Sequence, residues 1–190
     1  MSPDNLLAGL RRGDAAAFAA VYARFRSRLY GFLRRAVRRD DVAEDLFQET
    51  WMALARAAPD LRDDTDLAAW LFTVARNAFR NHARWARLDL SRWVAFCDDA
   101  CPTPAPGPEA VTARTRLLAA VEEALGALPA RHREVLLLVG VEDLAQEQVA
   151  QILGISYAAL RQRLARARAA LAARVGHEVD GEEAHERAFG

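Results

Sequence analysis

The stretch QVAQILGISYAALRQRLARAR, residues 148–168, has the order of a helix-turn-helix. A short segment with one apolar side comes first, Gly154 allows a tight turn, and Ser156 can cap the helix that follows. Because successive residues of a helix are separated by about 100°, four apolar residues of this second helix share one side. We expect them to face a core: Leu160, Leu164, Ala167 and Leu171.

The opposite side of the second helix carries residues suited to DNA. Residues 155–174 hold five Arg and no acidic residue. Small side chains at Ala158 and Ala165 would let the backbone approach a major groove, while Arg and Gln reach base edges or phosphates. A solvated cationic face is the alternative, and the preceding helix and glycine turn favour DNA binding. The candidate DNA contacts are Ser156, Arg161, Gln162, Arg163, Arg166 and Arg168.

Apolar residues recur at helical spacing through most of the chain, and no run of useful length alternates as a β-strand requires. Prolines at positions 102, 104, 106 and 108 interrupt the pattern and predict an extended connector. Before it we expect three helices, beginning near Asp14, Asp41 and Asp66; after it we expect four, over 111–128, 131–140, 144–153 and 157 to about 175. The sequence thus predicts an all-α protein of two small helical domains joined by a flexible, proline-rich linker, with a C-terminal helix-turn-helix.

The third N-terminal helix, from about Asp66, has a polar stripe. Its apolar side is expected to centre near Leu67 and to contain Leu67, Trp70, Leu71, Val74, Ala78 and Phe79. The stripe opposite contains Thr73, Arg76, Asn77, Arg80, Arg84 and Arg87, and the acidic loop RDDTD precedes it at residues 62–66. Since an Asn amide can hydrogen-bond an unstacked base, the stripe is a candidate single-strand contact; a plain solvated face is the open alternative.

The net charge of zero conceals an uneven distribution of charge along the chain. All 26 basic residues are Arg and are balanced by 26 acidic residues, yet residues 76–92 hold five Arg and one Asp, and residues 178–190 hold five acids and one Arg. Two local basic patches on a neutral chain are typical of nucleic-acid binding.

Several other classes of function are disfavoured. We find no G-x-S-x-G, P-loop or H-E-x-x-H motif and no convergent acid pair, so we expect neither an enzyme nor a cofactor. Cys97 and Cys101 lack the further ligands of a zinc site, and we expect inert thiols, with a redox or metal role as the alternative. The longest apolar run, Val135–Val141, is seven residues, and the N-terminus lacks the pattern of a secretory signal, so we expect a cytoplasmic protein without membrane insertion.

Four blocks in order carry a family resemblance. They are GDAAAFAAVYARFRSRLYGFLRR at 13–35, DVAEDLFQETWMALAR at 41–56, LAAWLFTVARNAFRNHAR at 67–84, and the segment 128–171 that contains the helix-turn-helix. Together they resemble the extracytoplasmic-function (ECF, group IV) sigma factors of bacterial RNA polymerase. The resemblance implies a region 2-like domain over residues 1–96, a linker over 97–110, a region 4-like domain over 111–176 and an acidic tail over 177–190.

The resemblance also implies partners and the residues that bind them. The helix-turn-helix residues named above would read a minus-thirty-five promoter element. Asn77, with the loop that holds Asp63 and Asp64, matches the pocket for a flipped minus-ten base, and Thr73, Arg76, Arg80 and Arg84 would follow the melted strand. Core RNA polymerase would be bound through the clamp helices of its largest subunit and the flap of its second-largest subunit. The residues that match the clamp-binding surface are Asp45, Leu46, Gln48 and Glu49. An anti-sigma factor is the further partner that the resemblance implies.

The sequence departs from the family pattern at three positions. Ala145 stands where the family usually has a capping Ser or Thr, so we expect the first helix of the helix-turn-helix to begin at Asp143 or to fray. Leu160 and Gln162 replace the common Val and Ser, so relatives do not predict the promoter sequence. A conventional helix-turn-helix regulator that dimerises through its N-terminal bundle, or a helical adaptor, are the competing hypotheses.

Overall fold

The structure is a computed structural model that describes residues 3–92, 113–142 and 144–189. Side chains are described from Leu6 to Arg84, from Leu118 to Glu142 and from Leu144 to Val175. The proline-rich stretch, both cysteines and Asp143 therefore lie outside the described residues. Within these ranges every regular element is a helix, which confirms the all-α prediction. No helix among them is both long enough and apolar enough to cross a membrane.

The chain divides into two compact units, residues 1–100 with 151–154 and residues 101–150 with 155–190. The N-terminal unit is built on α1 (Pro3–Arg11), α2 (Ala15–Val37), α3 (Asp40–Ala57), the short 3-10 turn η1 (Ala58–Asp60) and α4 (Leu67–Arg92). The C-terminal unit is built largely on α5 (Ala113–Ala127), α6 (Ala130–Leu136), the π-helical turn η2 (Leu137–Val141), α7 (Gln146–Leu153) and α8 (Tyr157–Phe189). Both units thus contain the helices that the sequence predicts, and the N-terminal unit contains α1 in addition.

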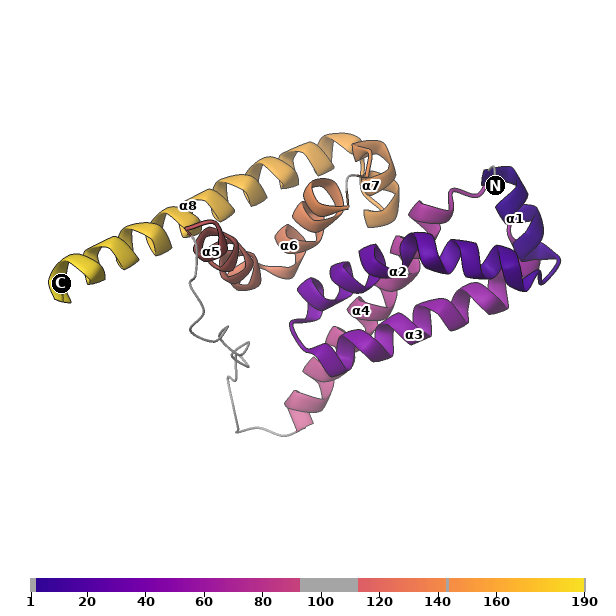
Figure 1. Cartoon of the computed structure of the whole chain (residues 1–190), viewed down its shortest axis with the longest axis horizontal. Helices are drawn as coiled ribbons and strands as arrows, with labels where there is room; N and C mark the ends of the chain where they lie inside the picture. Colours follow the sequence, from indigo (N-terminus) through magenta and orange to yellow (C-terminus); the bar gives the residue numbers. More distant parts are fainter. Residues whose placement is uncertain (1–2, 93–112, 143, 190) are drawn as a thin grey trace. The chain divides into compact units, whose positions relative to one another are not determined.

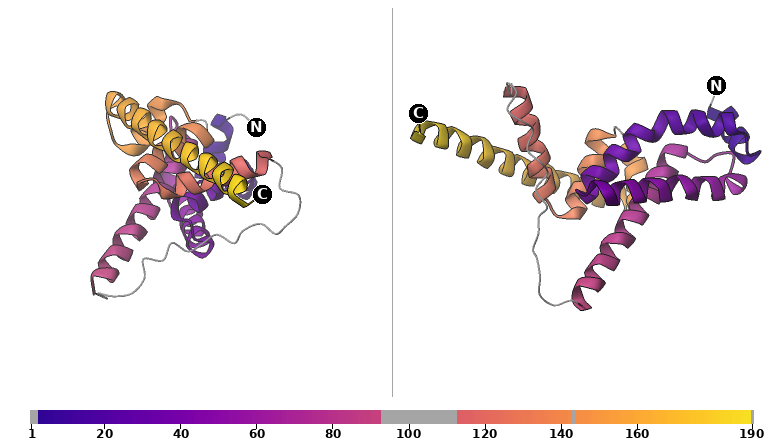
Figure 2. Two further views of the ribbon diagram at one scale, coloured as in Figure 1. Left: turned by 90° about the vertical axis from the view of Figure 1, so that its left-hand side faces the viewer. Right: turned by 60° about the horizontal axis from the view of Figure 1, so that its bottom comes forward.

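In the N-terminal unit α2 and α3 lie side by side and α4 crosses them (Figure 1). Asp14 begins α2 as predicted, because its carboxylate accepts a hydrogen bond from the backbone N–H of Ala16 at 2.8 Å. The ring centroids of Phe32 and Phe72, both fully buried, lie 5.5 Å apart at 85°, which joins α2 to α4 edge to face. The C-terminal part of α4 extends beyond the ends of α2 and α3 (Figure 2).

The buried side of α4 differs from the one expected. Leu71 and Phe79 are buried as predicted, but Phe72 and Ala75 are buried too, whereas Leu67 is only half-buried. The buried side is therefore centred on Ala75 and not on Leu67. The reason is that α4 packs against both α2 and α3, so its apolar side is wider than contact with a single neighbour requires.

Three features of the C-terminal unit also differ from the prediction. The helix expected over 131–140 is α6 followed by a π-helical turn. α7 begins at Gln146, and Ala145 donates its backbone N–H to the side chain of Gln148 at 3.1 Å, so one half of a capping box remains although the capping hydroxyl is missing. α8 was expected to end near Val175, but its backbone continues to Phe189, so the acidic tail is helical (Figure 1).

Candidate functional site

The turn before α8 has the geometry that the sequence predicts. Gly154 has φ of +64°, in the left-handed region that glycine adopts without strain. The hydroxyl of Ser156 accepts a hydrogen bond from the backbone N–H of Ala159 at 3.2 Å, which confirms Ser156 as the cap. Leu160, Leu164 and Ala167 are buried, which fixes the rotation of α8 about its axis. The residues predicted to face outward are consequently brought to the surface.

The outer face of α8 combines small side chains with cations. Ala158 and Ala165 are exposed, as are Gln162 and Arg166. Arg161 and Arg168 are also exposed, and Arg163 is half-buried at the flank. No acidic side chain of the described residues forms an ion pair with these four guanidinium groups, so their charges remain uncompensated at the surface. Such a face can enter a major groove with the backbone close to the bases.

His132 of α6 lies beside this cationic face, and no motif in the sequence predicts a role for it. Burial lowers the pKa of His132 below its usual value, and three neighbouring guanidinium groups lower it further: Arg131, Arg163 and Arg166. The Nδ1 atom is buried and has no hydrogen-bond partner among the described residues. Arg131 is its neighbour in the sequence, but only the packing of α6 against α8 brings the ring to Arg163 and Arg166, so spacing along the chain gives no signal for these two.

Acidification is expected to destabilise the C-terminal unit through His132. Because the folded pKa lies below that of the unfolded chain, the unfolded state binds more protons between the two values, and stability falls as the pH drops below about 6.5. His132→Gln should reduce this loss, and His82→Gln, at an exposed position of α4, is the matched control. Thermal unfolding followed by circular dichroism from about pH 8 to about pH 5 measures it. Equal pH dependence in the parent and His132→Gln would contradict the assignment.

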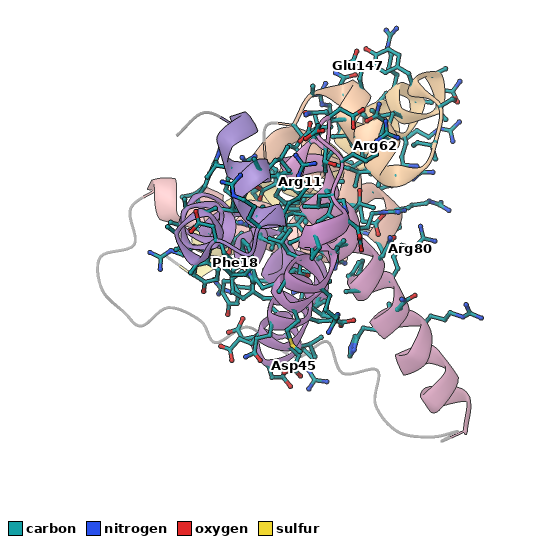
Figure 3. The ribbon with its side chains drawn as sticks, turned by 90° about the vertical axis from the view of Figure 1, so that its right-hand side faces the viewer. Arg11, Phe18, Asp45, Arg62, Arg80 and Glu147 are labelled. Atoms are coloured by element: carbon teal, nitrogen blue, oxygen red, sulfur yellow. The ribbon has the colours of Figure 1, made fainter. Side chains whose placement is uncertain are left out.

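Three of the six residues in the polar stripe of α4 are exposed. Asp66 caps the helix by accepting the backbone N–H of Ala69 at 3.0 Å. Asn77, Arg80 and Arg84 are exposed on the side opposite Ala75, and Arg80 points outward in Figure 3. The other members of the stripe are less available. Thr73 is half-buried and donates its hydroxyl to the carbonyl of Ala69, Arg76 is 6% exposed, and the side chain of Arg87 lies outside those described.

The acidic loop before α4 forms two ion pairs. Arg62 pairs with Asp64 within the loop at 3.0 Å, and Asp63 pairs with Arg11 of α1. Thr65 donates its backbone N–H to the carbonyl of Arg62 at 3.1 Å, which closes a turn. The loop and Asn77 both belong to the N-terminal unit. The loop lies directly before the first residue of α4, and Asn77 lies ten residues further along the helix than Leu67.

The outer face of α3 is acidic. Asp45, Gln48 and Glu49 are exposed, whereas Leu46 is 4% exposed and packs in the core. Three of the four candidate residues therefore face solvent, and Leu46 supports the helix from within. Met52 is 58% exposed on the same face. It was not singled out from the sequence, although its spacing of four residues from Gln48 places it there.

Known proteins share both units. The family model described as "Sigma-70 region 2" matches residues 21–88, and that described as "Sigma-70, region 4" matches residues 118–171. The chain is similar to RNA polymerase sigma factor CarQ of Myxococcus xanthus, with 34% identity over 80% of this chain and 86% of the relative. It is also similar to ECF RNA polymerase sigma factor EcfG of Rhodopseudomonas palustris, with 34% identity over 75% of each chain.

A solved structure is similar over both units. It is the sigma factor RpoE in complex with the anti-sigma factor NepR from Bartonella quintana, with a TM-score of 0.71 and 26% identity over 84% of this chain and 96% of that chain. The helix-turn-helix, the polar stripe of α4 and the acidic face of α3 all lie within the residues that match the two sigma-70 regions. The chain thus belongs to the sigma-70 family, as an ECF sigma factor that serves promoter-directed transcription initiation.

Proposed function

We propose that three surfaces of this sigma factor make three separate contacts during initiation. The outer face of α3 binds core RNA polymerase, the stripe of α4 with the loop 62–66 holds the melted minus-ten strand, and the start of α8 reads the minus-thirty-five element. The proposed domains are those given above, residues 1–96 and 111–176, joined by a linker over 97–110, with residues 177–190 as an acidic extension. The observation that carries the proposal is the outer face of α8, whose uncompensated guanidinium groups flank exposed alanines.

The minus-thirty-five contact is supported by the arrangement of that face. Gln162 and Arg166 lie at its centre, where side chains reach base edges, while Arg163 and Arg168 lie at the flanks, where phosphates run. Arg161 stands at the border, within reach of either. Ser156 begins the helix, so the backbone N–H groups beside it can bind a phosphate.

The minus-ten contact is supported by α4 and the loop. Asn77 offers an amide to the edge of an extruded base, and the turn closed by Thr65 presents Asp63 and Asp64 close to the start of the helix. Arg80 and Arg84 continue the exposed side and can bind the phosphates of the melted strand. Arg76 and Thr73, which are less exposed, would act at the border of this contact.

The polymerase contact is supported by the charge of α3. Asp45, Gln48 and Glu49 form a polar, acidic face suited to the clamp helices of the largest subunit. Met52 adds apolar area to the same face. The C-terminal unit would in turn contact the flap of the second-largest subunit. An anti-sigma factor is a further partner, by analogy with the complex of RpoE and NepR.

Because the two units contact two promoter elements, promoter binding is expected to depend on avidity. One Arg-rich helix makes few phosphate contacts, so the free protein should bind promoter DNA weakly. When core polymerase holds both units, the second contact becomes intramolecular and its effective concentration rises. The protein performs no catalysis itself, and it acts in the cytoplasm, where it meets polymerase and the chromosome.

Run-off transcription from a genomic fragment library tests the proposal. Purified core polymerase is assayed with and without the protein, in parallel with gel shifts that lack core. New transcripts that share two short promoter elements, together with weak binding by the protein alone, are expected. A tight shift without core and no new transcripts would instead indicate a conventional helix-turn-helix regulator.

Asn77→Ala is expected to impair promoter opening more than promoter binding. Loss of one hydrogen bond of about 1 kcal/mol corresponds to roughly a five-fold loss of open complex. Asn81→Ala, one turn later on α4 and also exposed, is the matched control. Permanganate footprints measure opening, and filter binding of the holoenzyme measures association. Footprints of Asn77→Ala as strong as those of the parent would remove Asn77 from the pocket.

A further inference from the structure

α1 is firmly packed on α2, although it precedes the residues that match region 2. Leu6, Leu7 and Leu10 are buried. A Cβ atom built on Gly9 would lie 2.5 Å from the Cβ of Ala17, so the two helices approach as closely as a glycine allows. The backbone N–H of Gly13, which has φ of +70°, bonds to the carbonyl of Leu10 and ends the helix. α1 is therefore a fixed support.

The loop between η1 and α4 is fixed at both ends but not at its tip. At its start η1 contacts α1, and Leu61 is buried. At its end Asp66 caps α4. Between them the tip extends into solvent, with 85% of the side chain of Asp63 and 71% of that of Asp64 exposed. The backbone contacts thus place the loop, and side-chain contacts must orient the tip.

Two ion pairs meet at this tip, and they differ in what they join. The pair of Arg62 with Asp64 lies within the loop, so it moves with the tip. The pair of Arg11 with Asp63 joins the tip to α1, from a residue 52 positions earlier in the sequence. The side chain of Arg11 is only 30% exposed, so its own position is restricted by its neighbours. Figure 3 labels Arg11 and Arg62 in this part of the unit.

We propose that Arg11 is a positioning residue for the minus-ten pocket. By holding Asp63 it orients the tip of the loop toward the captured base, and it neutralises a carboxylate that would otherwise repel the phosphates of the melted strand. The inference rests on the proposed function of the loop and deepens it. It gives α1 a part in base selection, although α1 lies before residues 21–88, which match region 2.

Open-complex formation by the full-length protein with core polymerase tests this role. Arg11→Ala, Arg11→Lys and the control Arg12→Ala, which removes the same charge from an exposed neighbour, are compared on four promoters that differ only in the captured base. An exposed ion pair is worth at most about 1 kcal/mol, so Arg11→Ala should lower open-complex occupancy by about two- to five-fold. It should also flatten the preference among the four bases. Arg11→Lys should recover most of both effects, and Arg12→Ala should behave as the parent.

Core binding and thermal unfolding of the same variants separate positioning from a purely structural role. Equal melting temperatures and equal core affinity for Arg11→Ala and Arg12→Ala would support positioning. An unchanged base preference in Arg11→Ala, or a loss that Arg11→Lys does not recover, would overturn the inference while leaving the sigma activity intact. If the parent protein opened none of its promoters, the proposed function of the loop would fail and this inference with it.

Discussion

Replacing Arg133 with alanine is expected to lower the free energy of unfolding of the C-terminal unit by about 3 kcal/mol. The Arg133 guanidinium donates hydrogen bonds to three backbone carbonyls at the end of α5, those of Leu125 at 3.0 Å, Gly126 at 2.5 Å and Leu128 at 3.0 Å. The carbonyl of Leu125 also accepts the backbone N–H of Leu128 at 3.2 Å, whereas those of Gly126 and Leu128 have no further turn of helix to bond them. A cation there also complements the helix dipole. The side chain is half-buried, so water replaces these bonds incompletely.

The distribution of tryptophan allows this loss to be assigned to one unit. All four Trp residues lie within residues 51–93, so tryptophan fluorescence reports on the N-terminal part of the chain, whereas far-ultraviolet circular dichroism reports on both units. In Arg133→Ala the dichroism transition should move to lower urea while the fluorescence transition stays in place. Arg131→Ala, which removes an exposed charge two residues earlier, is the control. Arg133→Lys should recover less than half, because an ammonium cannot reach three carbonyls as a planar guanidinium does.

Replacing Arg166 with alanine is expected to reduce promoter-dependent transcription by ten-fold or more at limiting polymerase. Arg166 lies at the centre of the outer face of α8, and a base contact by Arg is worth about 1–3 kcal/mol. If the contact is to a base, the loss should disappear on a promoter whose minus-thirty-five element is already altered at that position. If it is to a phosphate, all promoters should weaken alike and the salt dependence should fall by about one unit of slope.

Arg174→Ala is the matched control for Arg166→Ala. Arg174 is exposed on the same helix, two turns beyond the proposed contact, and its replacement by alanine removes the same charge. Transcription should stay close to that of the parent, and both variants should bind core polymerase with unchanged affinity. An equal loss of transcription in Arg166→Ala and Arg174→Ala would mean that the outer face of α8 acts only through its total charge, and no loss in Arg166→Ala would remove Arg166 from the promoter contact.

Features set by local interactions could be predicted from the sequence. The turn at Gly154, the caps at Asp14 and Ser156 and the burial of Leu160 depend on residues within one or two turns of helix, and the structure confirms them. α1 had one local signal that spacing alone overlooked, because Pro3 stands at its first residue, where proline favours the start of a helix.

Features that depend on packing could not be predicted in this way. The buried side of α4 is centred on Ala75 because two helices contact it, and periodicity within α4 cannot reveal a second neighbour. The contacts of Arg133 with the end of α5, and of Arg11 with Asp63, join residues whose proximity depends on how the chain folds back. The proposed contacts of Asn77, Asp45 and Arg166 remain predictions, since exposure makes them available without identifying what they bind.

The close approach of α1 and α2 limits how this protein can be recombined with its relatives. Position 9 admits no side chain while position 17 carries a methyl group that is fully buried. A chimera that takes its first helix from another sigma factor must therefore bring a matching pair of residues at both positions. When promoter specificity is engineered by exchanging domains between sigma factors, the exchanged segment should therefore begin at α1 and not at residue 21, where the match to region 2 begins.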